Sequence, residues 1–67
     1  MLVKELILNS LETFKSFKIQ YSYYKDTTKE LPLTKQLYEK VADKEIDFYY
    51  LDIDEYNQPY ISIKLEN

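Results

Sequence analysis

The chain has 67 residues and a formal net charge of −3, and it contains no Cys, His or Gly. This length fits one small domain, so we expect residues 1–67 to fold as a single domain. Without Cys and His the usual nucleophile–base pairs and transition-metal sites cannot be built, and without Gly there is no glycine-rich phosphate loop, so we expect a non-enzymatic protein without a cofactor.

The composition also indicates a compartment. The absence of Cys fits a reducing environment, the first residues lack the pattern of a secretion signal, and no apolar run approaches the roughly 18 residues of a membrane span. Tyr, Lys, Leu and Ile are abundant and have codons rich in A and T. We therefore expect a cytoplasmic protein of an AT-rich bacterium, or of a phage or plasmid in such a cell, with no membrane partner.

Charge is unevenly distributed along the chain. Residues 1–44 hold eight Lys and six acids, which leaves +2, whereas residues 45–67 hold one Lys and six acids, which leaves −5. No cation occurs between Glu45 and Ile63. This asymmetry favours an acidic face and a partner of the opposite charge.

The first predicted element is an amphipathic helix over residues 2–17. Its polar side mixes Lys and Glu, whereas a membrane-surface helix carries mainly Lys or Arg there, so we expect this helix to pack on a sheet. Its apolar residues recur at spacings of three and four, as on one stripe of a helix: Leu2, Val3, Leu6, Ile7, Leu11, Phe14 and Phe17.

Residues 18–25 alternate in polarity and predict a first strand, with Ile19, Tyr21 and Tyr23 on one face. Asp26 breaks the alternation, and an irregular stretch is expected up to Pro32.

A second helix is expected over residues 34–43. Thr34 is the predicted N-cap, and Leu33 just before it can meet Tyr38 as a hydrophobic staple. Leu37 and Val41 would lie on the buried side of this helix.

Two further strands are predicted over residues 46–53 and 59–65, with Asn57 in a left-handed position of the turn between them. The last strand alternates cleanly, with Ile61 and Ile63 on one face. Residues 46–53 are apolar on both faces, which is typical of a central strand, so we expect this strand between the other two.

The predicted fold is therefore α+β: helix, strand, helix, strand, strand, with a three-stranded sheet and both helices on one face. If the second helix is a crossover, the first two strands are parallel. An antiparallel arrangement of all three strands is the alternative.

The candidate binding site is the segment FYYLDIDEY, residues 48–56, which places aromatic and aliphatic residues among carboxylates. Phe48 and Tyr50 share a strand face with Asp52 and Asp54, and this face is open if both helices cover the other one. Tyr is enriched at binding hot spots, and carboxylates steer a protein towards a basic groove. The predicted partner-binding residues are Asp47, Phe48, Tyr50, Asp52, Asp54, Glu55, Tyr56 and Tyr60, with Tyr24 as a further contributor.

We therefore expect a small acidic binding protein with a basic protein partner. The partner class we favour is a nucleic-acid-handling enzyme whose basic groove is occupied by the acidic hairpin. By analogy of size and charge alone, this profile fits a phage- or mobile-element-encoded inhibitor.

Three alternatives stay open. The same surface could join two copies in a homodimer or serve a purely structural role. KIQYSYYK, residues 18–25, interleaves Lys with Tyr as single-stranded nucleic-acid binders do, but the net negative charge and the absence of Arg make direct nucleic-acid binding the less favoured reading. A loose divalent-cation site at Asp52, Asp54 and Glu55 is the third, since the match to a calcium loop fails at three later positions.

Overall fold

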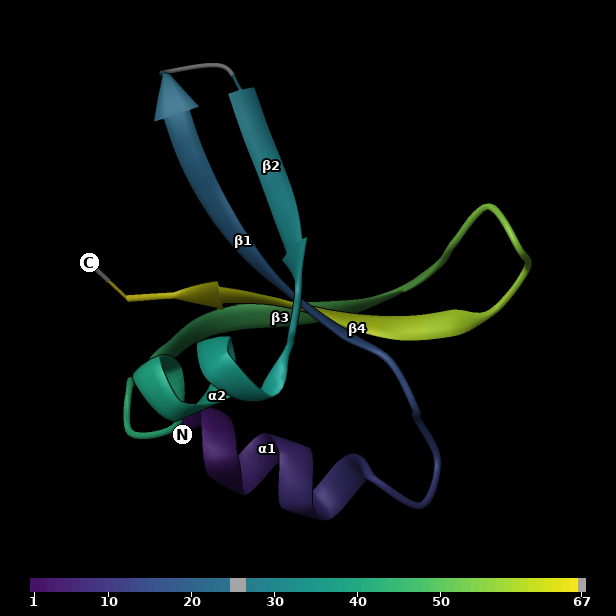
Figure 1. Ribbon diagram of the computed structural model, residues 1–67, viewed down its shortest axis with the longest axis horizontal. Coiled ribbons are helices and arrows are strands. Elements are labelled where there is room, and N and C mark those ends of the chain that lie inside the picture. The colour runs from purple at the N-terminus through teal and green to yellow at the C-terminus, as the bar shows by residue number, and fades with distance from the viewer. Residues whose placement is uncertain (25–26, 67) are drawn as a thin grey trace.

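The computed structural model describes residues 1–24 and 27–66, with the backbone alone for residues 21–24, 27 and 28. Two helices and four strands follow one another in this part of the chain (Figure 1). The fold is α+β, and the four strands form one sheet of order β2-β1-β4-β3. In chain order the elements are α1 (Val3–Ser10), β1 (Phe17–Tyr24), β2 (Thr27–Pro32), α2 (Lys35–Val41), β3 (Ile46–Ile53) and β4 (Pro59–Leu65).

The sheet is mixed. β1 pairs antiparallel with β2, β3 pairs antiparallel with β4, and the two hairpins meet through a parallel contact between β1 and β4. That contact covers only residues 17–20 of β1. The outer half of β1 therefore pairs with β2 alone, and the β1–β2 hairpin rises away from the β3–β4 pair in Figure 1.

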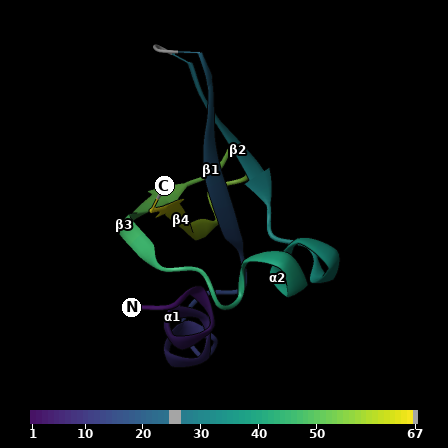
Figure 2. The same cartoon turned by 90° about the vertical axis from the view of Figure 1, so that its left-hand side faces the viewer.

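The hydrophobic core lies between the two helices and one face of the sheet. Both helices lie on the same side of the strands in Figures 1 and 2. Ile61 and Ile63 share the core face of the last strand, as predicted, and are 2% and 0% exposed, but Tyr60 and Ser62 on the opposite face are buried as well. Each of the two Ile side chains stabilises the fold by about 1.5–3 kcal/mol. The buried core residues are Val3, Leu6, Ile7, Phe17, Ile19, Val41, Ile46, Ile61 and Ile63.

The first helix is shorter than the predicted helix over residues 2–17. α1 ends at Ser10, and residues 11–13 form one further turn, in which the carbonyl of Ser10 accepts hydrogen bonds from the backbone N–H of Thr13 at 3.0 Å and of Phe14 at 2.8 Å. Phe17 then begins β1 and is buried there. Of the later apolar residues of the predicted helix, Phe14 and Phe17 still pack on the core, whereas Leu11 is exposed.

The second helix agrees with its predicted N-cap. The hydroxyl of Thr34 accepts a hydrogen bond from the backbone N–H of Leu37 at 3.2 Å, which satisfies one of the free donors of the first turn. Val41 is buried on the core side, and Leu33, Leu37 and Tyr38 pack against the core.

The predicted three-stranded sheet is wrong, because residues 27–32 form β2 rather than an irregular stretch. β2 pairs with β1 in a register that runs from Lys18 opposite Pro32 to Tyr24 opposite Thr27. Thr is a β-branched residue that favours strands. Pro32 is tolerated because it ends a strand at the edge of the sheet.

The predicted central position of strand 46–53 is also wrong. This strand is β3 at the edge of the sheet, and β4 lies between β1 and β3. The parallel neighbour of β1 is β4 rather than β3, which overturns both the predicted parallel pair and the all-antiparallel alternative. The physical reason is that the polar face of β4 is covered by side chains of β1 and β2, whereas the large side chains on both faces of β3 stay 42–60% exposed.

Candidate partner-binding surface

Five of the ten large apolar side chains that are exposed in the described part of the chain lie on β3, and the others are spread over Met1, Leu8, Leu11, Leu31 and Tyr56. Phe48, Tyr49, Tyr50 and Leu51 follow one another along this edge strand and are 49%, 44%, 42% and 60% exposed. Ile53 completes the strand at 59%. Single exposed apolar residues are ordinary, but a contiguous run of them is typical of an interaction surface.

The face of β3 away from the helices carries Phe48, Tyr50 and Asp52. The register places these three residues opposite Lys64, Ser62 and Tyr60 of β4, respectively. The neighbours on β4 alternate with the core residues Ile61 and Ile63, so this face of the sheet is the one opposite the helices. The predicted grouping of Phe48, Tyr50 and Asp52 on one strand face is thus present.

The helix-side face of β3 borders a groove of about 440 Å³. Tyr49, Leu51 and Ile53 lie on this face, because they pair with Ile63, Ile61 and Pro59 of β4. α1 ends at Ser10, and Thr13 and Phe14 of the segment that follows line the groove opposite β3. The residues that line it are Thr13, Phe14, Leu51, Asp52, Ile53 and Pro59.

The turn after β3 is held together by Asp54. One oxygen of its carboxylate, Oδ1, accepts hydrogen bonds from the backbone N–H of Tyr56 at 2.8 Å and of Gln58 at 2.9 Å. The predicted left-handed position is confirmed, because Asn57 has φ 62°. Asp54 therefore has a structural task, while Glu55 and Tyr56 project from the turn, with Tyr56 77% exposed.

The remaining carboxylates of this region face solvent. Asp47, Asp52 and Glu55 are exposed, and none of them forms an ion pair within residues 1–24 and 27–66. Asp52 makes one local contact, since its Oδ1 accepts a hydrogen bond from the backbone N–H of Ile53 at 2.8 Å. The ion pairs of the described chain lie elsewhere, for example Lys4 with Asp43 at 2.7 Å.

The surface thus combines unpaired negative charge with apolar area. We name this set, made up of β3 together with Glu55 and Tyr56, the acidic–aromatic surface.

Tyr60 differs from its prediction as an open aromatic residue, because it is only 4% exposed. Its hydroxyl donates to Oε1 of Glu30 at 3.3 Å, and the ammonium of Lys18 lies 4.2 Å from the centre of its ring. Burial, together with the charges of Glu30 and Asp52, raises the pKa of Tyr60 to about 12.

Tyr60 belongs to a polar cluster that the sequence did not reveal. Ser62 is fully buried; its hydroxyl donates to Oε2 of Glu30 and accepts from Nε2 of Gln20 at 2.9 Å. Glu30 lies on β2, so its side chain crosses β1 to reach β4. Glu30 can have this role only because residues 27–32 form a strand. The sequence feature that could have predicted this strand is the pair Thr27 and Thr28, since Thr favours strands.

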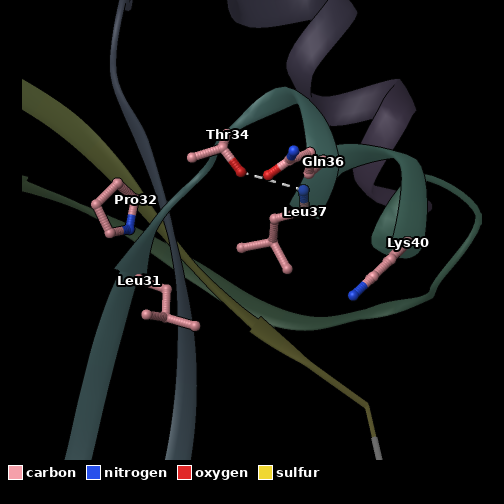
Figure 3. Close-up of a pocket in the computed structure, with 6 residues that line it drawn as sticks. All are labelled: Leu31, Pro32, Thr34, Gln36, Leu37 and Lys40. Carbon is pink, nitrogen blue, oxygen red and sulfur yellow. Dashed lines mark hydrogen bonds between the residues drawn. The ribbon is translucent and has the colours of Figure 1, made fainter.

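Figure 3 shows a second groove, of about 310 Å³, between β2 and α2. The side chains of Leu31 and Leu37 approach it, Thr34 caps the helix beside it, and Lys40 lies at one end. None of the predicted partner-binding residues lies there. Its lining consists of Leu31, Pro32, Thr34, Gln36, Leu37 and Lys40.

Some predictions concern positions that the structure leaves open. The side chains of Tyr21, Tyr23 and Tyr24 and the whole of Lys25 lie outside the described part of the chain. Among the described residues, no group of three or more His, Cys, Asp or Glu side chains gathers in a way that could hold a metal ion. Within the same residues, the helices are too short and too polar to cross a membrane.

No protein-family model, curated protein or solved structure matches this chain.

Proposed function

We propose that this chain is a small, non-enzymatic binding protein that contacts a basic partner protein through its acidic–aromatic surface. The observation that carries the proposal is the run Phe48–Leu51, in which four large side chains on one edge strand are each more than 40% exposed. Burying such side chains is worth about 1.5–3 kcal/mol each. Because these side chains are 42–60% exposed, about half of this free energy is left for a partner to gain.

The charge of the surface indicates the class of partner. Asp47, Asp52 and Glu55 are exposed and surround the apolar run, and the sequence has no cation between Glu45 and Ile63. Carboxylates at the rim of an interface speed association with a positively charged site and disfavour acidic partners. A basic groove that binds nucleic acid has the required charge, so we propose a nucleic-acid-handling protein as the target and inhibition as the outcome.

The competing use of this surface is self-association. Two copies could cover each other's β3, but each copy would bring the same carboxylates, and residues 45–67 carry −5. Like charges facing each other across an interface disfavour the complex. The basic heterologous partner therefore fits the surface better than a second copy does.

The experiment is a capture of proteins from a bacterial lysate on the immobilised chain, followed by a binding measurement with each purified captured protein. The test variant is Asp52→Asn/Glu55→Gln, which keeps Asp54 and its turn intact. The matched control is Glu12→Gln/Glu39→Gln, which removes the same charge from exposed positions outside the acidic–aromatic surface. We expect about tenfold weaker binding for the test variant at low salt and little change for the control.

A second pair of variants tests the apolar part. Phe48→Ser and Tyr50→Ser should abolish capture while the protein stays folded, because both side chains are exposed. Equal capture by wild type and all of these variants would show that another surface binds the partner. A protein that elutes at twice the chain mass and captures nothing would favour self-association.

A further inference from the structure

We infer that the basic partner adds an extended strand to the free edge of β3, and that this strand alternates Lys or Arg with apolar residues. The inference rests on the proposed function and specifies how its surface is used. In such complexes main-chain hydrogen bonds supply affinity, and pockets for alternate side chains supply specificity.

The edge of β3 is available beyond its first residue. The other edge pairs with β4. On the available edge the chain's own start covers one position: the backbone N–H of Ile46 donates to the carbonyl of Met1 at 2.8 Å, and Leu2 forms an antiparallel bridge with Glu45. From Asp47 to Ile53 no further segment of the described chain pairs with this edge. The N-terminal residues thus already begin a strand-like contact that a partner can continue.

The two edges of the sheet are protected differently. Edge strands usually carry Lys, Pro or a bulge that discourages pairing with another chain. β2, the opposite edge, carries Lys29 and ends at Pro32. β3 has neither residue type, and its one irregularity lies between Ile46 and Phe48, ahead of the apolar run. The edge of β3 therefore keeps a regular stretch, Phe48–Asp52, that is suited to pairing, and at its end the backbone N–H of Ile53 already donates to Oδ1 of Asp52.

The surroundings of β3 define the side chains of the added strand. Successive residues of a strand point to opposite faces. On the helix side they would meet the groove lined by Phe14, Leu51 and Ile53, which takes apolar side chains. On the other side they would lie beside Tyr50 and Asp52, where a Lys or Arg finds a carboxylate and an aromatic ring. This alternation of apolar and basic residues gives the partner's segment its chemistry.

The test uses a synthetic peptide, Lys-Val-Lys-Val-Lys-Val-Lys, and the full chain. The matched peptide has the same side chains but carries N-methyl groups on two consecutive central residues, so that both of its edges lose a donor and gain a bulky group. Binding of each peptide is measured by titration, and amide hydrogen exchange of the protein is followed by NMR. We expect the methylated peptide to bind at least about tenfold more weakly, a difference of about 1.4 kcal/mol. We also expect exchange to slow at amides of β3 and to stay unchanged at amides of β2.

Each other outcome overturns the inference and can be told apart from failure of the proposed function. Equal binding of both peptides would show that charge and side chains alone make the contact. If neither peptide binds, while a captured basic protein still depends on Asp52 and Glu55, the surface is used without strand addition. If β3 amides are already protected in the free protein and its mass is that of two chains, a second copy occupies the edge. Failure of the proposed function itself would appear as capture that is indifferent to Asp52 and Glu55.

Discussion

Replacing Glu30 by Ala should destabilise the protein strongly, although the residue lies in an edge strand. Its carboxylate accepts hydrogen bonds from the hydroxyls of Tyr60 and Ser62, which are 4% and 0% exposed. A hydrogen bond to a charged group contributes about 1.5–3 kcal/mol, and leaving a buried hydroxyl without an acceptor adds a penalty. Because Glu30 is itself half-buried, we expect a loss near the low end for the pair, about 2–4 kcal/mol in total. A chain of this length has a stability of only about 3–10 kcal/mol.

The assay is urea unfolding, followed by far-UV circular dichroism because the chain has no Trp. With a slope of about 1 kcal/mol per molar urea, Glu30→Ala should lower the midpoint by about 2–4 M, or leave the protein unfolded at the outset. Glu30→Gln keeps an acceptor oxygen and should lose less than half as much. Glu39→Ala, at an exposed position of α2, is the matched control and should shift the midpoint little. A midpoint for Glu30→Ala within error of that control would refute the idea that Glu30 ties β2 to β4.

Two further predictions concern Asp54 and Tyr60. Asp54→Ala should lower the free energy of unfolding by about 1–2 kcal/mol in the same urea assay, because the backbone N–H groups of Tyr56 and Gln58 lose their acceptor. Asp54→Asn keeps a carbonyl oxygen and should lower it less. Equal losses for the two variants would contradict this account. The pKa of Tyr60 is about 12 in the folded protein against 10.0 for the free side chain. As the pH rises, the unfolded chain therefore loses the phenol proton before the folded protein does. The contribution of Tyr60 to the free energy of unfolding is thus fully present below pH 10 and is lost as the pH rises towards 12. The stability difference between wild type and Tyr60→Phe should shrink by about 1–2 kcal/mol over that range, and a constant difference would show that the phenol is not shielded.

The local features that the sequence predicted correctly are those fixed by neighbouring residues. The cap at Thr34 and the left-handed position at Asn57 each depend on a few adjacent atoms, and both are present. Alternation in 59–65 marked the strand that supplies Ile61 and Ile63 to the core. Such signals act over a single turn or along one strand, so the sequence carries them directly.

The order of the strands could not be read in the same way. Apolar residues on both faces of residues 46–53 predicted a covered central strand, but the pattern records only which side chains are apolar and not what covers them. The deciding contact is long-range: Glu30 reaches across β1 to Ser62 and makes the polar face of β4 an interior position. Ser62 is fully buried beside a carboxylate, and hydropathy does not reveal this burial, so the alternation in residues 59–65 does not show that both faces of β4 are covered. The structure leaves Phe48 and Tyr50 of β3 exposed, because their exposure depends on the strand's own residues and on the lack of a further strand beside it in the described chain, whereas Tyr60 is buried. Binding of a partner by this surface stays a prediction.

The burial of β4 limits what the fold requires of β3. β4 is covered on both faces, by the core on one side and by Lys18, Gln20 and Glu30 of β1 and β2 on the other. β3 therefore has to supply the sheet only with its backbone pairing and with Ile46, which is its buried residue. Strand formation at an edge is served equally well by Thr or other polar β-formers, which avoid unwanted pairing. Four consecutive large side chains at Phe48–Leu51 are thus more than the fold requires, and a surface of this composition is stabilised only when something covers it.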